Sequence, residues 1–505
     1  MIRKRLALWR LPAIAVGAAV AIGVAGCGGD SGTDEASGPA KIRVLLNAQP
    51  ATLDPIAGAR SAQVVWATMI EPLINTDSSL EPERTGLITD WKRSSSTKWT
   101  FTVRSGVKFS NGEPADAAAV ANTLKLTRDS KTSILKPYFA NVASIEATDD
   151  ATVEVKTKRP QYDLPYLLTT VYLVPPKYYE EKGPEGFSAA PVGTGPYVFE
   201  EAKPGREISV KVNPDYWGDK PKNTGITFTW ATEASQRLAL LQSKSVDVAL
   251  DLPPTQAEQA RKAGLQVVET ESAMKITAFL DATKPPFNKA ELREAAALAI
   301  NRDEIVQGIF NGKAAADAGV LNVKPGTQPV DKVTPDPAKA KELVGSSSPS
   351  VNLTYPAAQY TNIKEVAESI GASLEGVGFK VKYRSVDYGT LVKEVAGRQI
   401  DGMYLLAAVP NAAIPDFFAT GFMKTASITG NCPDPKIDGL VDKAREQKDA
   451  TAAQQVYDEL NTLAVVDKHC YVPLYRQLYA YGTGEGVQGV VYGPLNTFDF
   501  TEATR

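Results

Sequence analysis

The sequence predicts an α/β architecture spread over two or three domains. Strand-like runs and helical patterns alternate along most of the chain, which is typical of a sheet covered by helices. The part that can fold, from residue 41 onward, has about 465 residues, more than a single hydrophobic core usually holds. Hydrophobic residues make up 43% of the chain and charged residues 22%, so a sizeable globular core is expected.

The first 26 residues have the layout of a signal peptide. Four cations precede an uncharged apolar run at 11–24, which is shorter than the roughly 20 residues of a membrane-spanning helix. The run ends in the sequence VAGC at 24–27, which resembles the lipobox of bacterial lipoproteins. The resemblance implies cleavage before Cys27 and attachment of lipid to its sulfur. The alternative is an ordinary signal peptide with a chance cysteine.

Residues 27–40 are predicted to form a flexible tether, because they are rich in Gly, Ser and acidic residues and lack large apolar side chains. Removing the four cations of residues 1–26, which hold no acid, changes the formal charge from −3 to −7. This mildly acidic body gives no reason to expect nucleic acid or an anionic lipid surface as partner. We expect a protein on the outer face of the cytoplasmic membrane that contacts the membrane through its lipid anchor only.

Three cysteines are present, and if Cys27 carries lipid then Cys432 and Cys470 remain. An exported protein lies in an oxidising compartment, so a disulfide between these two is expected. The alternative is two separate buried thiols, and the distance between the two residues would decide between a disulfide and free thiols.

The pattern of apolar residues predicts the individual elements. Helices are predicted at 61–70, 116–126, 235–243, 289–301, 302–311, 337–344, 363–375, 438–448 and 452–465. Strands are predicted at 41–46, 99–103, 107–109, 152–156, 197–212 (two runs), 222–230, 246–250, 351–355, 381–386 and 401–406. The runs at 470–475 and 478–482 suit either a strand pair or one bent strand.

Short motifs follow one another along the body. They are LDP at 53–55, EPL at 71–73, WTFTVRSGVKFSNG at 99–112, PVGTGPYVF at 191–199 with NPDYWG at 213–218, PPFN at 285–288 with REA at 293–295 and AINRD at 299–303, and VPLY at 472–475. Together and in this order they resemble the peptide/nickel class of solute-binding proteins that serve ABC importers, the extracellular solute-binding protein family 5. The resemblance covers the body from about residue 42 to the C-terminus.

The resemblance implies a two-lobed periplasmic-binding-protein fold of the class with an extra subdomain in lobe I and a hinge between the lobes. Lobe I would span 41–272 with the inserted subdomain at about 75–190, lobe II would span 273–475, and 476–505 would return to lobe I. A ligand between the lobes contacts both only when they close, so binding favours the closed form. The implied function is a monomeric receptor that captures a solute, an oligopeptide first of all, for the permease subunits of an ABC importer.

The sequence contains none of the catalytic motifs considered below. The chain has one histidine, His469, and it lacks a serine elbow, a C-x-x-C and an H-E-x-x-H motif. Gly193-Thr194-Gly195 lacks the third glycine and the following helix of a dinucleotide-binding motif, so we expect it to be structural. We therefore expect no enzyme, no metal site and no cofactor.

Dipeptide binders of this family share two charged residues that anchor the ligand, and this sequence lacks both at the matching positions. Those are an aspartate for the ligand ammonium, just after a Gly-Trp pair, and an arginine for the carboxylate. Here aliphatic residues replace the Gly-Trp pair, and the aspartate position falls on Val409 or Asn411. Gln359 or Tyr360 takes the place of the arginine. A dipeptide held at both ends is therefore disfavoured. Two other ligands stay open: a longer peptide held by its backbone, and a neutral polar ligand such as a sugar. A degenerate fold that acts as an envelope regulator also stays open.

Polar residues at the ends of predicted strands are the candidates for ligand contact. Amides would form hydrogen bonds, and tyrosines would stack and donate. The candidates are Asn47, Gln49, Gln359, Tyr360, Tyr404 and Asn411. The alternative for each is an ordinary polar residue of a loop or strand end. Trp99 and Trp217 lie within structural motifs and are expected in the core.

Overall fold

The computed structural model describes residues 40–505, apart from residues 59, 325, 326, 330, 358, 409–413, 494 and 496 and the side chains of residues 60, 61 and 408. The predicted signal peptide, the tether up to residue 39 and the anchor at Cys27 lie outside these residues, and so does Asn411. Within the described ranges, no helix has the length and apolar character that crossing a bilayer requires.

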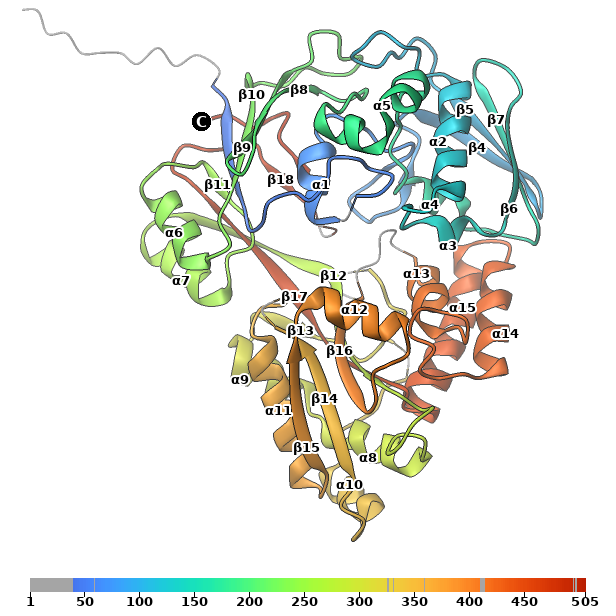
Figure 1. Ribbon diagram of the computed structural model, residues 1–505, viewed down its shortest axis with the longest axis vertical. Helices are drawn as coiled ribbons and strands as arrows, with labels where there is room; N and C mark the ends of the chain where they lie inside the picture. The colour runs from blue at the N-terminus through green and yellow to red at the C-terminus, as the bar shows by residue number, and fades with distance from the viewer. Residues whose placement is uncertain are drawn as a thin grey trace, which may run out of the picture. The chain divides into compact units, whose positions relative to one another are not determined.

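One mixed sheet of 11 strands connects the two halves of the chain. Its two longest strands, β12 (Gln266–Leu280) and β17 (Tyr471–Thr483), pair antiparallel side by side (Figure 1). The sheet continues on one side of this pair through β11 (Val248–Ala249), β1 (Ile42–Leu46), β10 (Gly225–Trp230), β9 (Glu207–Val212) and β8 (Tyr197–Lys203). It continues on the other side through β16 (Met403–Ala408), β14 (Ser350–Pro356) and β15 (Lys380–Val386), while β13 (Ala314–Ala316) pairs with β17.

The two wings of the sheet attach to opposite ends of the β12–β17 pair. Strand β11 pairs with Gly482 and Thr483 at one end, and β16 pairs with 275–280 of β12 at the other. The pair is therefore the shared element between the wing that contains β1 and the wing that contains β14.

The first wing is covered by α1 (Arg60–Trp66), α5 (Pro176–Ala189), α6 (Ala234–Gln242) and α7 (Pro254–Lys262). The C-terminal tail joins this core, because Phe500 and Ala503 are buried beside Ile226 and Phe228 of β10. The tail carries the short strands β18 (Val491–Tyr492) and β19 (Phe498–Asp499).

Two of the sequence motifs meet in this region. The carboxylate of Glu71 accepts hydrogen bonds from the hydroxyl of Tyr216 at 3.0 Å and from Nε1 of Trp217 at 2.8 Å. Gly195 donates its N–H to the carbonyl of Met69 at 2.9 Å, and a Cβ on Gly195 would lie 2.8 Å from that oxygen. The glycine-containing loop is thus needed for close backbone packing, which is the structural role expected for it.

The segment predicted as a subdomain forms its own antiparallel sheet in the order β4 (Ile88–Ser95), β5 (Lys98–Val103), β7 (Thr152–Thr157) and β6 (Val142–Ala147). Trp99 and Phe101 of β5 are buried under α2 (Ala117–Asp129), whose N-terminus is capped by Asp116 at 3.0 Å from the N–H of Ala119. Its other elements are β2 (Asn75–Thr76), β3 (Pro82–Glu83), α3 (Lys136–Phe139) and α4 (Leu164–Leu168). Trp99 is a core residue, as expected, while Trp217 is half-buried against the same core.

The second wing carries most of the remaining helices. They are α8 (Ala290–Ala299), α9 (Arg302–Phe310), α10 (Pro337–Val344), α11 (Ile363–Gly376), α12 (Tyr388–Ala396), α13 (Asp416–Phe418), α14 (Pro435–Arg445) and α15 (Ala450–Asn461), with π-helical turns η1 (Ala419–Met423) and η2 (Thr462–Asp467). A disulfide joins Cys432 to Cys470, whose Cα atoms are 5.9 Å apart. Cys470 directly precedes β17, so the disulfide ties the loop before α14 to the central strand pair.

The α/β class predicted from the sequence is confirmed, and residues 471–482 lie in the single strand β17 rather than a strand pair. Residues 107–109 form no strand, since Lys108 makes only an isolated bridge with Pro114. The lobe boundaries after residues 272 and 475 stay a prediction, and they fall inside β12 and β17.

Candidate functional site

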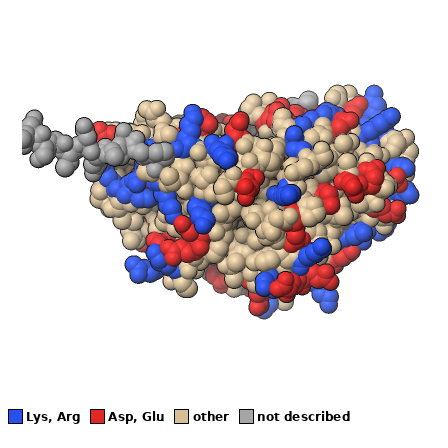
Figure 2. Space-filling view, turned by 90° about the horizontal axis from the view of Figure 1, so that it is seen from above, with Lys and Arg blue, Asp and Glu red and all other residues tan. Residues whose placement is uncertain are grey.

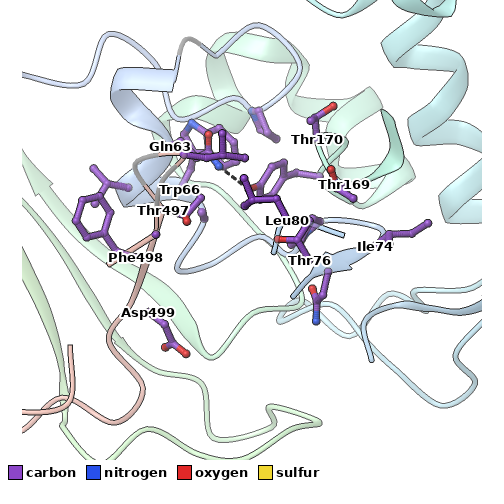
Figure 3. A pocket seen from close by; sticks show the side chains of 18 of the residues that line it. Gln63, Trp66, Ile74, Thr76, Leu80, Thr169, Thr170, Thr497, Phe498 and Asp499 are labelled. Atoms are coloured by element: carbon purple, nitrogen blue, oxygen red, sulfur yellow. Dashed lines mark hydrogen bonds between the residues drawn. The ribbon is translucent and has the colours of Figure 1, made fainter. Parts of the chain in front are cut away.

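A cavity of about 610 Å³ opens beside helix α1 and the C-terminal tail. Five segments line it: the second half of α1 with the loop before it, residues 72–83, residues 134–135, residues 169–172 and residues 491–499. Figure 3 shows Gln63 and Trp66 of α1 beside Thr497 of the tail. The volume lies within the range of about 300–1,000 Å³ that is typical of small-molecule sites.

The lining combines aromatic and apolar side chains with polar groups that can form hydrogen bonds. Hydroxyls and amides come from four of the five lining segments, and they include Gln63, Asn75, Thr76, Thr169, Thr170 and Thr497. Three carboxylates, those of Asp77, Glu83 and Asp499, also line the cavity. Such a mixture can hold a polar organic ligand by hydrogen bonds while its apolar parts contact rings and aliphatic groups.

Trp66 and Gln63 are held in place from one side of the cavity. The amide nitrogen of Gln63 donates to the hydroxyl of Tyr172 at 2.7 Å, and the ring of Tyr172 packs edge-to-face on Trp66 with centroids 4.3 Å apart. Trp66 is 4% exposed, and its indole Nε1 has no hydrogen-bond partner in the part of the chain that the structure describes. An unpaired buried donor is unfavourable, and this indole nitrogen is too enclosed to be reached from the cavity.

None of the five described candidates from the sequence lines this cavity. Asn47 and Gln49 are exposed just after β1, and Gln359 is exposed after β14. Tyr360 is 7% exposed, and its hydroxyl accepts a hydrogen bond from the N–H of Ala407 at 3.1 Å. Ligand contact by the three exposed amides stays a prediction.

Tyr404 was expected to stack on a ligand, but it packs in the protein core. Its ring lies parallel to that of Phe279 with centroids 5.0 Å apart, and the residue is 3% exposed. Burial also raises the pKa of the Tyr404 hydroxyl well above its ordinary value. Residues 403–407 of β16 are all buried, so Tyr404 belongs to a strand that is covered on both faces.

A buried charge cluster joins the predicted subdomain to α13 and α14. Asp163 and Asp416 are fully buried, and Arg445 is 7% exposed. The Nε of Arg445 lies 3.4 Å from Oδ1 of Asp416, and Gln161 donates to Oδ1 of Asp163 at 2.8 Å. Burial, followed by the nearby charge of Asp416, raises the pKa of Asp163 to about 7.

A second buried cluster lies along the β12–β17 pair. Nζ of Lys275 is 3.2 Å from Oδ2 of Asp317, and Nε of Arg476 is 2.7 Å from the same oxygen. Burial lowers the pKa of Lys275 to about 7. Burial raises the pKa of Asp317, but the charges of Lys275 and Arg476 outweigh it, so the net shift is downward. Because these groups satisfy one another, they are stabilising elements of the strand pair rather than free ligands.

Metal binding gains no support from the described residues, which contain no group of three His, Cys, Asp or Glu side chains able to hold an ion. His469 lies apart from the cavity, just before β17, and burial lowers the pKa of its imidazole. On the face shown in Figure 2, Lys and Arg are interspersed with Asp and Glu.

Comparisons with known proteins agree with this architecture. The model of the bacterial extracellular solute-binding proteins, family 5, matches residues 84–430. The glutathione-binding protein GsiB of Salmonella paratyphi A is 29% identical over 371 residues, which are 71% of this chain and 72% of that protein.

Two solved structures share the fold. NikA from Brucella suis, in complex with Fe(III)-EDTA, superposes with a TM-score of 0.82 at 21% identity over 92% of this chain and 99% of its own. A dipeptide-binding protein from Pseudoalteromonas sp. SM9913, in complex with Met-Leu, gives 0.79 at 20% identity over 92% and 100%. The predicted two-lobed periplasmic-binding-protein fold is thereby confirmed. The family match and the shared fold together establish that this chain belongs to the bacterial extracellular solute-binding proteins of family 5.

Proposed function

We propose that this protein captures an oligopeptide between its lobes and delivers it to the permease subunits of an ABC importer. The observation that carries the proposal is the family match over residues 84–430. The cavity of about 610 Å³, lined by amides, hydroxyls and aromatic rings, falls wholly within the ranges predicted for lobe I and its return, so it can supply at most the lobe I side of an interlobe site. Peptide backbones present alternating donors and acceptors, which such groups can satisfy without a charged anchor at each end. The similarity to a glutathione-binding protein supports a peptide-like ligand.

The receptor is proposed to work as a monomer on the outer face of the cytoplasmic membrane, held there by lipid on Cys27. It binds and releases its ligand without changing it, and it needs no cofactor. Membership of a solute-binding family supports this non-enzymatic role. A cavity of this volume also favours ligand capture over a degenerate fold that acts as an envelope regulator, since such a fold would need no space for a solute.

The experiment is mass spectrometry of the purified protein for a co-purified ligand, followed by calorimetric titration with peptides of two to six residues and with a panel of sugars. We expect a peptide among the co-purified compounds and saturable binding of at least some of the peptides. Binding of sugars alone would replace the peptide with a neutral polar ligand. Absence of binding to every peptide and sugar would contradict a transport function.

A further inference from the structure

The two wings of the molecule meet at a second place besides the β12–β17 pair. The predicted subdomain packs on α13, α14 and α15, which belong to the range predicted for lobe II (Figure 1). The ring of Tyr138 stacks on that of Phe417 with centroids 4.2 Å apart, and its hydroxyl donates to the carbonyl of Phe417 at 3.1 Å. On the exposed rim, Arg159 contacts both carboxylate oxygens of Asp442, at 3.0 and 3.1 Å. A movement of the lobes about the strand pair has to form or separate these contacts.

The centre of this contact is polar and incompletely hydrogen-bonded. The charge of Arg445 acts on both Asp163 of the subdomain and Asp416 of α13. Oδ2 of Asp163, Oδ2 of Asp416 and Nη2 of Arg445 are buried without a hydrogen-bond partner among the described residues. Such atoms make a buried contact less favourable, whereas water can hydrate them once the contact opens. The centre therefore suits a contact that separates better than one that is permanently closed.

Ionisable groups surround Asp163 on every element that packs against it. They are Arg93 of β4, Tyr162 and Tyr166 of the subdomain, Asp416 of α13, Arg445 of α14 and Tyr457 of α15. Burial first, and then the charge of Asp416, raise the pKa of Asp163 to about 7, although the charge of Arg445 opposes them. In water the ordinary pKa of the same carboxyl is 3.8. Between these two values, Asp163 holds a proton in the closed contact and has lost it in an open one.

We infer that residues 138–166 and 416–457 form a clasp that closes together with the lobes, and that Asp163 takes up one proton from solvent as the clasp closes. The inference requires the two lobes to move about the strand pair, and it does not depend on a peptide as the ligand. Because the closed form binds the extra proton, closing becomes less favourable as the pH rises from 3.8 toward 7, and it no longer depends on pH above about 8. A ligand that binds the closed form loses affinity over the same range.

The experiment follows the lobes directly and without a ligand. Dyes are attached to Lys125→Cys on α2 of the subdomain and Lys341→Cys on α10 of the second wing, which are both exposed positions. Cys27→Ser in every sample and the disulfide between Cys432 and Cys470 leave only these two thiols for labelling. Energy transfer in single molecules then counts the closed and open forms. We expect the ratio of closed to open molecules to be about tenfold lower at pH 8 than at pH 6.

Two variants of the labelled protein assign the effect. Asp163→Asn keeps an oxygen for the hydrogen bond from Gln161 but has no proton to gain, so its ratio should agree at the two pH values to within about twofold. Arg159→Gln is the matched control, because it removes the ion pair with Asp442 on the rim and leaves Asp163 in place. It should lower the ratio at both pH values and retain the dependence of about tenfold.

The inference is overturned if the labelled protein without either variant has the same ratio at pH 6 and pH 8, or shows a single population at both. It is also overturned if Asp163→Asn keeps the full dependence on pH. These samples contain no ligand, so none of these results bears on whether a peptide binds. The search for a co-purified ligand and the titrations with peptides and sugars decide the proposed function separately.

Discussion

Nε of Arg445 lies 3.4 Å from Oδ1 of Asp416, and both side chains are buried where α4 of the predicted subdomain meets α13 and α14. Asp163 adds a second buried carboxylate to this single guanidinium. The N–H of Tyr162 donates to the carbonyl of Arg445 at 3.2 Å, so the backbone of the predicted subdomain is hydrogen-bonded to the backbone of α14. With both carboxylates ionised the cluster would carry a net negative charge away from water, which explains why one of them favours its protonated form.

Stability should therefore depend on the ionisation of Asp163. Its pKa is about 7 in the folded protein against an ordinary 3.8, so the folded protein binds more protons between these values. The stabilisation that protonated Asp163 contributes to folding is complete below pH 3.8 and is lost as the pH rises toward 7. Over this range the folding equilibrium constant falls by up to about tenfold per pH unit. In Asp163→Asn the side chain stays neutral, and the loss of stability between pH 5 and 8 should be smaller than in the wild type. Thermal denaturation across this range measures the difference.

The control for this prediction is Asp149→Asn, which removes a carboxylate from an exposed turn. Its stability should follow the wild-type dependence on pH. If Asp163→Asn also follows the wild-type curve, then Asp163 is ionised in the folded protein and the explanation above is wrong.

The cluster on the central strand pair predicts a large effect of Asp317→Asn. This change leaves Lys275 and the fully buried Arg476 without their shared carboxylate. Removing one partner of a buried ion pair typically lowers the free energy of unfolding by about 3–5 kcal/mol. Urea denaturation of Asp317→Asn and of the exposed ion-pair variant Glu485→Gln, which loses only a surface contact with Lys244, gives the comparison. Equal midpoints for the two variants would contradict a stabilising role for the buried cluster.

The sequence predicted the architecture better than the site, and particular residues show why. Strand β17 was predicted because its residues are mostly apolar, but the longer β12 was missed. Its first six residues are exposed or half-buried and its last nine are buried, so it shows neither a steady alternation nor one apolar run. The reason is that β12 passes from one wing of the sheet to the other, and sequence periodicity does not report such a change of surroundings.

The site residues were harder to predict because a cavity depends on packing between distant segments. Gln63 and Trp66 belong to a helix that was predicted, but their spacing equally suits a helix packed on a core. Thr497 and Asp499 come from a tail that meets α1 only through the fold. The family anchors lie at strand ends, but at those positions in this chain Tyr404 is a core residue and Asn47 is exposed.

Reduction of the disulfide should destabilise the protein. Cys432 and Cys470 are 38 residues apart, and closing a loop of this length in the unfolded chain is worth about 4 kcal/mol in the chain-entropy model. The variant Cys432→Ser/Cys470→Ser should therefore unfold at a lower guanidinium concentration than the wild type. Addition of dithiothreitol should lower the midpoint of the wild type toward that of the variant and leave the variant unchanged. A wild-type midpoint that matches the variant without reductant would show that the bond contributes nothing.

The lipid anchor is tested at Cys27. If the VAGC sequence is processed as a lipobox, the mature chain begins at Cys27 and carries acyl chains that hold it on the membrane. Fractionation of cells in the native host should then find the wild type with the membranes, and Cys27→Ser should leave the membrane fraction or keep its uncleaved signal segment. Mass spectrometry of the N-terminal peptide distinguishes these forms, because lipidation adds the mass of the acyl chains to Cys27. Cys432→Ser is the control, since it removes a cysteine without touching the anchor. Recovery of wild-type protein with an unmodified Cys27 in the soluble fraction would contradict the anchor and leave the peptide-binding proposal unaffected, because the cavity lies wholly within residues 55–499.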